Sequence, residues 1–162
     1  MTEVSNEISI SEEDPRRGDA SALCDEMAEF VLRTYPEDAE NGVIPSTRED
    51  LATKGMFVVA RLDGWACGAA AVLAHEPVDG LATMEVKSMY VREKARGRRV
   101  AEQMLRWLEL MARMRGTQKL VLQCGPRQPE ALRLYERCGY SVRSAYGIHN
   151  DHPLSIFFEK RL

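Results

Sequence analysis

Five basic side chains crowd the start of a predicted helix. They lie in the segment VREKARGRRVAEQML (91–105) and are Arg92, Lys94, Arg96, Arg98 and Arg99. The free N–H groups at a helix start carry partial positive charge, so the first turn normally favours Asp and Glu. A bound anion would reverse that preference, because backbone N–H groups and guanidinium groups both hold phosphate well. The segment therefore indicates a phosphate site, and the alternative is a basic patch exposed to solvent.

Gly97 gives this segment the backbone freedom that a phosphate site needs. The segment lacks the G-x-x-x-x-G-K-[ST] pattern of a P-loop. It also has one glycine where a dinucleotide-binding fingerprint has three. We therefore expect a polyphosphate ligand bound in a manner that belongs to neither class.

A strand and a helix must position these basic residues. The run LATMEVKSMYV (81–91) predicts a long strand, and residues 97–115 predict a helix that Gly116 ends. The apolar residues on one face of that helix are Val100, Met104, Leu108 and Met111. A strand that turns directly into a helix presents unpaired N–H groups at one point.

Apolar runs before this strand predict the rest of a sheet. Segments 56–62 and 65–73 are joined by Asp63-Gly64, a strong signal for a type I′ hairpin. The HEPVDG segment (75–80) is predicted as the following turn. These runs favour an antiparallel arrangement.

The N-terminal third predicts one strand and two helices. Val4, Ile8 and Ile10 share a face of the strand. The first helix places Leu23, Met27, Phe30 and Val31 at helical spacing. Residues 36–45 are predicted as an acidic loop, and Ser46 with Glu49 forms a capping-box signature for the second helix.

The C-terminal third predicts a buried strand, a helix and two final strands. KLVLQC (119–124) is continuously apolar enough for a sheet centre, and Pro129 and Gly139 bracket the helix. Residues 140–146 and 154–162 are predicted as strands. The resulting order, βααβββαβαββ, predicts one domain over 1–162 of the α/β (α+β) class. Its central sheet would be mixed, largely antiparallel and flanked by helices.

Composition excludes several function classes. The net charge of −3 argues against a nucleic-acid partner. The sequence contains no run of 18 apolar residues, so no membrane span is predicted. The acidic N-terminus lacks the apolar core of a secretory signal. A cytoplasmic location is therefore expected. The four cysteines contain no C-x-x-C pair, which favours reduced thiols over a zinc site or disulfides.

Two segments, 84–105 and 120–140, together resemble the GNAT superfamily of acetyl-CoA-dependent N-acetyltransferases. In that family a Q/R-x-x-G-x-G/A loop holds the pyrophosphate of coenzyme A. Arg96 and Ala101 match its first and last positions, and Arg99 replaces the usual middle glycine. The later N-x-x-A-x-x-L-Y signature is matched by Gln128, Ala131, Leu134 and Tyr135, with Gln in place of Asn.

The resemblance implies acetyl-CoA as co-substrate and no metal. The loop residues expected at the pyrophosphate are Arg96, Gly97, Arg98, Arg99, Val100 and Ala101, and Gln128 is expected to line the same site. In the family the fourth strand diverges from the fifth, and pantetheine lies in the gap. By that analogy, the N–H of Met89 would meet the thioester carbonyl, Tyr90 would line the gap, and Val91 would pair with pantetheine amides.

Two residues are candidates for catalysis. By resemblance, Tyr135 would lie near the thioester sulfur and protonate the departing thiolate; the alternative is a tyrosine that only packs. Glu85 stands eleven positions before Arg96, a spacing that family members with a glutamate base share. The alternative for Glu85 is a strand residue that pairs with Lys87 on the same face.

The expected reaction is direct acetyl transfer to a primary amine by an acyltransferase for groups other than aminoacyl groups. A small-molecule acceptor is favoured, because no extended peptide-binding insertion is evident. A protein or peptide acceptor and a non-catalytic acyl-CoA-binding regulatory module remain alternatives. Dimers are common in the family, so a homodimer is compatible with the resemblance.

Two weaker features concern the acceptor. His149 and His152 flank Asp151 in a loop, which is weak evidence for a metal site and modest evidence for substrate contact. The acidic residues Glu37, Asp38 and Glu40 could attract a cationic amine or simply face solvent.

Overall fold

The computed structural model describes residues 6–40, 46–147 and 155–162. The elements are β1 (Ile8–Glu12), α1 (Gly18–Thr34), α2 (Pro36–Glu40), α3 (Arg48–Thr53), β2 (Gly55–Leu62), β3 (Trp65–Val78), β4 (Leu81–Val91), the 3₁₀ turn η1 (Glu93–Ala95), α4 (Val100–Met114), β5 (Lys119–Cys124), α5 (Pro129–Arg137), β6 (Ser141–Arg143) and β7 (Ile156–Arg161). The predicted mixed α/β class is confirmed. The short helix α2 is an addition to the predicted order.

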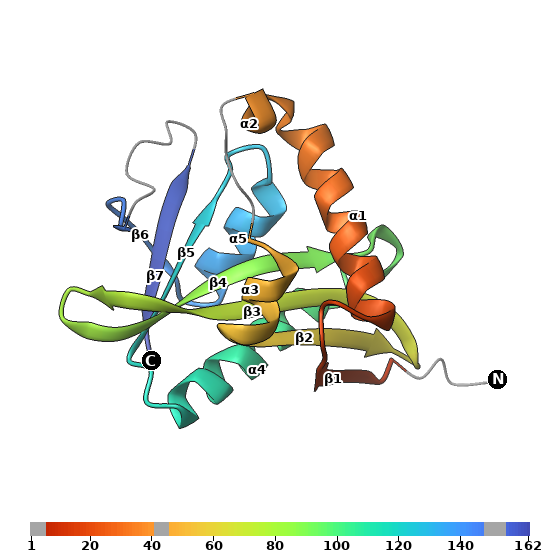
Figure 1. Cartoon of the computed structure of the whole chain (residues 1–162), viewed down its shortest axis with the longest axis horizontal. Coiled ribbons are helices and arrows are strands. Elements are labelled where there is room, and N and C mark those ends of the chain that lie inside the picture. The colour runs from red at the N-terminus through yellow and green to blue at the C-terminus, as the bar shows by residue number, and fades with distance from the viewer. Residues whose placement is uncertain (1–5, 41–45, 148–154) are drawn as a thin grey trace.

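Within the described residues, seven strands form a single sheet in the order β1-β2-β3-β4-β5-β7-β6. The neighbours β4 and β5 are parallel, whereas the other neighbouring pairs are antiparallel. Helices α1 and α3 cover one face, and α4 and α5 cover the other (Figure 1). A hydrophobic core lies on each face of the sheet, and alternate residues of β2 pack into the two cores. Val58 packs toward α4, whereas Phe57 packs toward α1.

The parallel strands β4 and β5 stay together over a short distance. Their register runs from Thr83 opposite Lys119 to Glu85 opposite Val121. Beyond Glu85, β4 continues to Val91 without a β5 partner, and the two strands diverge (Figure 1). The edge of β4 is therefore left without a neighbouring strand on that side.

A β-bulge in β4 changes which side chains face that gap. Lys87 pairs with Ala71 and Tyr90 pairs with Ala69, so two β4 residues oppose the single residue between them. Ser88 adopts a left-handed φ of 59° at this point. As a result Met89 packs toward α4, whereas unbroken alternation would have placed it on the face of Lys87.

Several predicted boundaries need correction. Ser46 and Glu49 were expected to cap α3, but its N-cap is Thr47. The Thr47 side chain accepts from the Asp50 N–H at 3.0 Å, so the capping pair lies one residue later in the chain. The HEPVDG segment is mostly strand, since β3 extends to Val78 and the turn is Asp79-Gly80. The predicted loop at 36–45 begins with α2, and the predicted strand at 140–146 is confined to β6.

The Asp63-Gly64 turn is confirmed as type I′. Both residues have positive φ, 49° and 85°, and they join Leu62 directly to Trp65 across the hairpin.

Three buried tyrosines should make the fold sensitive to alkali. Burial, together with nearby Glu109 for Tyr140 and Glu85 for Tyr146, raises the pKa of both phenols, and burial also raises the pKa of Tyr135. Above pH 10 the unfolded chain loses tyrosine protons that the folded chain keeps, so the unfolding free energy should fall. Urea titrations between pH 9 and 11 should show that Tyr146→Phe reduces this slope by an amount that grows with pH toward about 1.4 kcal/mol per pH unit. An unchanged slope would contradict the prediction.

Candidate functional site

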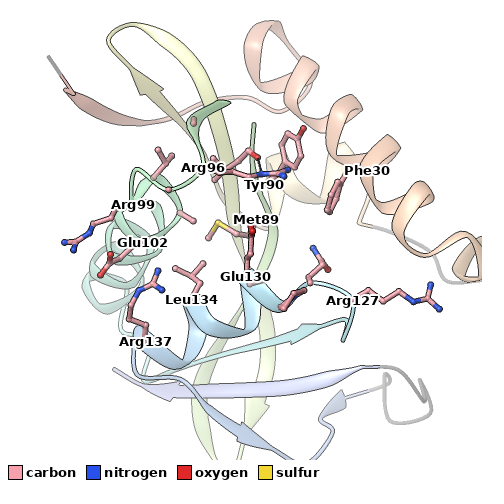
Figure 2. A pocket seen from close by; sticks show the side chains of 18 residues that line it. Phe30, Met89, Tyr90, Arg96, Arg99, Glu102, Arg127, Glu130, Leu134 and Arg137 are labelled. Atoms are coloured by element: carbon pink, nitrogen blue, oxygen red, sulfur yellow. Dashed lines mark hydrogen bonds between the residues drawn. The ribbon is translucent and has the colours of Figure 1, made fainter. Parts of the chain in front are cut away.

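A cleft of about 500 Å³ opens where β4 leaves β5. Its walls are the end of β4, the segment leading into the start of α4, helix α5 with the residues just before it, and one side chain of α1, Phe30 (Figure 2). Of the residues predicted to bind a cofactor, the lining includes Met89, Tyr90, Val91, Arg96, Gly97, Arg99, Val100, Ala101 and Gln128.

The β4 wall presents backbone groups that have no partner strand on the side of the cleft. The Arg92 N–H donates to the Cys67 carbonyl of β3 at 2.8 Å. Because successive residues of a strand bond toward opposite edges, the N–H and C=O of Val91 point away from β3 and toward the cleft. The Val91 carbonyl accepts there from Arg96 Nε at 3.1 Å.

Tyr90 faces the opposite side of β4 from Val91 and meets α1. Its ring centroid lies 6.1 Å from that of Phe30. The Arg96 guanidinium also lies over the Phe30 ring, 5.7 Å from its centroid. Phe30 therefore closes one end of the cleft by contacts with both β4 and the loop that precedes α4.

The start of α4 is shaped for an anion. Arg99 is the N-cap with φ 63° and ψ 23°, and its side chain makes no cap hydrogen bond. This left-handed conformation suits glycine, so Arg99 keeps the backbone geometry of the residue that it replaces in the family motif. Gly97 also has a positive φ, 80°. The first-turn N–H groups of α4, beside Val100 and Ala101, face the cleft without helical partners.

Two arginines of the lining are free to bind an anion. Within the parts of the chain that the structure describes, neither Arg99 nor Arg137 has a carboxylate within ion-pair distance. Arg99 and Arg137 lie at one end of the cleft with Glu102 between them, whereas Phe30 and Arg127 lie at the other end (Figure 2). Glu102 is engaged by Arg106 at 2.7 Å, which reduces its repulsion of an anion.

The Arg98 side chain lies away from the cleft. It reaches Asn6, 3.4 Å from Oδ1, and it does not belong to the cleft lining. The basic segment therefore divides, with Arg96 and Arg99 at the cleft and Arg98 directed toward the segment before β1. Arg92 pairs with Glu26 of α1 at 2.8 Å, so its role is to join helix and sheet.

Tyr135 lies behind the cleft, next to the lining residue Leu134. It is 5% exposed, and its ring packs 5.8 Å from those of Tyr140 and Phe158. Burial, followed by the nearby thiols of Cys124 and Cys138, raises the pKa of Tyr135 above its usual value. The phenol is therefore protonated throughout the physiological pH range.

Glu85 is also buried and lies outside the cleft lining. The Tyr146 hydroxyl donates to its Oε2 at 2.6 Å, and Lys87 Nζ lies 3.2 Å from its Oε1. The Lys87 pairing that was the alternative for Glu85 is thus present, with the Glu85 carboxylate buried. The Tyr146 contact gave no signal in the sequence, because a residue 61 positions away provides it.

Of the remaining acceptor candidates, Glu37 does not line the cleft but pairs with a residue that does, and three others lie outside the described residues. Glu37 is engaged by Arg127 Nη1 at 2.6 Å. His149, Asp151 and His152 lie outside the described residues. In the part of the chain that the structure describes, no cluster of three His, Cys, Asp or Glu side chains could hold a metal, and no helix is long and apolar enough to cross a membrane. The four cysteines are unbridged.

Sequence reasoning missed several lining residues. Phe30 was predicted only as part of an apolar helix face, and Arg127 and Arg137 carried no motif. Glu102 and Glu130 also line the cleft. Their places depend on how distant elements meet, and the spacing of residues within one element does not contain that information.

Comparisons with known proteins agree with this geometry. Residues 21–140 match the acetyltransferase (GNAT) family profile. An IAA acetyltransferase of Azospirillum brasilense is 30% identical over 157 residues, which cover 96% of this chain and 98% of that protein. A Klebsiella pneumoniae structure classed as an acyl-CoA N-acyltransferase is 29% identical with a TM-score of 0.74, covering 96% and 97% of the two chains. A GNAT acetyltransferase of Elizabethkingia anophelis with acetyl-CoA bound is 19% identical, with a TM-score of 0.66 and coverage of 96% and 98%.

Proposed function

This chain belongs to the acetyltransferase (GNAT) family, and from that premise we propose that it transfers acetyl from acetyl-CoA directly to a primary amine of a small molecule. The observation that carries the proposal is the cleft where the unpaired edge of β4 meets the start of α4. A diphosphate suits the helix start, and an extended amide-containing arm suits a strand edge.

The proposed cofactor site divides between charge and backbone. Arg99, Arg137 and the first-turn N–H groups of α4 would hold the phosphates. The N–H and C=O of Val91 would pair with pantetheine amides, which requires Arg96 to leave the Val91 carbonyl. Once released, the Arg96 guanidinium would be available to the pyrophosphate beside it.

The proposed reaction uses three groups of this chain, which are the Met89 N–H, Tyr135 and Glu85. The amine nitrogen attacks the thioester carbonyl; a C–N bond forms, and the C–S bond then breaks. The Met89 N–H would stabilise the oxyanion. Tyr135 would give its proton to the departing thiolate and later regain one from solvent. Two observations support Tyr135 as the proton donor. It lies beside Leu134 of the cleft wall, and its burial keeps the phenol protonated.

We propose that Glu85 acts on the substrate ammonium. It would either accept a proton from the ammonium through a water molecule or bind the ammonium. Its carboxylate is buried on β4, four residues before Met89, on the side of the sheet covered by Tyr146. Tyr146 and Lys87 would fix both carboxylate oxygens. A fixed carboxylate can attract the ammonium and accept its proton through an intervening water.

Release of CoA thiol, measured across a panel of amines, tests the proposed function. The panel should contain polyamines, amino acids, aminoglycosides and peptides. IAA should be assayed beside the amines, because the Azospirillum brasilense relative is named for it. We expect sequential kinetics with a small amine. A peptide as the preferred acceptor would replace the small-molecule assignment, and acetyl-CoA binding without thiol release on any acceptor would indicate a regulatory module. Ping-pong kinetics with a trapped acyl-enzyme would reject direct transfer.

Arg99→Gly should change stability and binding in opposite directions. Glycine relieves the left-handed strain, so the unfolding free energy should rise by about 1 kcal/mol. Loss of the guanidinium should weaken acetyl-CoA binding about fivefold. Thermal unfolding and calorimetry measure both. Arg99→Ala is the matched control, which should lose the same affinity without the gain in stability; equal stability of the two variants would contradict the strain argument.

A further inference from the structure

Tyr35 joins the end of α1 to the connection between β5 and α5. Its side chain is buried, and its hydroxyl lies over Gly125, the residue that follows β5. A Cβ at position 125 would lie 2.0 Å from the Tyr35 hydroxyl oxygen, so the ring fits there only above a glycine. The two segments are therefore in direct contact at the end of the cleft that Phe30 and Arg127 line (Figure 2).

The Tyr35 hydroxyl makes two hydrogen bonds to the β5–α5 connection. It accepts from the backbone N–H of Arg127 at 3.1 Å. It donates to Oε1 of Gln128 at 3.4 Å. The first bond orients the hydroxyl, because its oxygen is committed to Arg127 and its hydrogen is left for Gln128.

Arg127 strengthens the same junction from outside. Its guanidinium lies 5.4 Å from the centroid of the Tyr35 ring. Arg127 Nη1 also donates to the Thr34 carbonyl at 2.9 Å and pairs with Glu37 at 2.6 Å. These contacts hold the Tyr35 hydroxyl in place relative to α5.

The Gln128 side chain does not make the hydrogen bond that is usual for a helix N-cap residue. It is the N-cap of α5 but makes no side-chain cap hydrogen bond, and it lines the cleft. A shorter Asn at an N-cap is well suited to bond the first turn of its own helix. The additional methylene of Gln128 lets its amide reach Tyr35. With Oε1 occupied, the two N–H groups of Nε2 remain available to a ligand.

We propose that Tyr35 is a positioning residue that fixes the Gln128 amide so that Nε2 donates to an amide or thioester carbonyl of the bound acetyl-CoA. This inference rests on the proposed function. It explains why Gln at this position is compatible with cofactor binding, and it assigns a role in the cofactor site to a residue of α1's C-terminal end.

A double-mutant cycle on acetyl-CoA affinity tests the proposal. Tyr35→Phe should weaken binding about fivefold and leave kcat unchanged, as expected for the loss of one hydrogen bond acting through a neighbour. Gln128→Ala should weaken binding by about the same factor or more. The double variant should bind no more weakly than Gln128→Ala alone. Additive losses would overturn the proposal, since Tyr35 would then act through the Arg127 backbone.

Two further variants fix the interpretation. Gln128→Glu keeps an acceptor for Tyr35 but removes the N–H donors, so it should lose at least as much affinity as Gln128→Ala. Wild-type affinity for Gln128→Glu would overturn the proposal even if Tyr35→Phe failed to fold. Tyr140→Phe is the control, because it removes a buried hydroxyl bonded to Glu109, away from the cleft, and should leave the affinity unchanged. A wild-type protein that does not bind acetyl-CoA would instead refute the proposed function, and this inference with it.

Discussion

Tyr135→Phe is expected to lower kcat by about a hundredfold, the lower end of the range for general acid catalysis. The Tyr135 hydroxyl makes no hydrogen bond among the described residues, and the ring packs against Tyr140 and Phe158, so phenylalanine should fit the same space. Affinity for acetyl-CoA should therefore change by less than about twofold. Turnover and calorimetric binding, measured on the same preparation, separate the two effects.

The pH profile provides an independent check of Tyr135. Its pKa is raised by burial and by the thiols of Cys124 and Cys138, and an acid is active in its protonated form. The raised pKa extends that form to higher pH, so kcat should show no fall near pH 10 from this group. Tyr140→Phe removes a comparable buried hydroxyl and should retain turnover. Wild-type turnover in Tyr135→Phe would show that the residue only packs.

Glu109→Ala is expected to lower the unfolding free energy by about 3 kcal/mol. Glu109 is a buried carboxylate of α4 that accepts from the Tyr140 hydroxyl at 3.0 Å and from Lys160 Nζ at 3.1 Å. Lys160 also donates to the Cys138 carbonyl at 2.8 Å. Removing Glu109 leaves the Lys160 ammonium and the Tyr140 hydroxyl without their charged partner where α4, β7 and the end of α5 meet.

Urea unfolding measures this loss, and Asp50→Ala is its control. Asp50 pairs with Lys54 at 2.9 Å at the surface, where the two side chains are 36% and 62% exposed. Pairs of that kind contribute at most about 1 kcal/mol. Equal destabilisation by the two alanine variants would contradict the importance of the buried cluster.

Apart from α2, the order of elements was predictable from local patterns, and so was the cationic helix start that lies at the cleft. Apolar residues at helical spacing defined α4, and Asp63-Gly64 defined the hairpin between β2 and β3. The cationic segment pointed to the end of β4 because such charge is unfavourable at a helix start without an anion. Each of these signals lies within one stretch of chain.

The divergence of β4 from β5 and the bulge at Ser88 were not predictable in this way. Both depend on which strands pair and over what length, and no Gly or Pro in residues 84–91 marks the change. The same limit applies to Phe30 and Tyr35, which α1 brings to the site from about 60 and 90 positions away in the chain. Their side chains gain a role only when the sheet and α1 are assembled.

Arg99 shows how a local departure can be compatible with an intact site. The sequence places an arginine where the family motif has glycine. The backbone there keeps the left-handed conformation, at the expense of about 1 kcal/mol of strain, and adds a cation at the mouth of the cleft. The arginine therefore adds a positive charge at the cost of a strained backbone conformation.

The central claim is that the cleft between β4, α4 and α5 binds acetyl-CoA through the start of α4. Calorimetric titration of the purified protein with acetyl-CoA tests it most directly. The account predicts saturable binding at one site per chain, with an affinity that Arg96→Ala and Arg99→Ala each weaken. Absence of heat or of a rise in melting temperature at millimolar acetyl-CoA would contradict it.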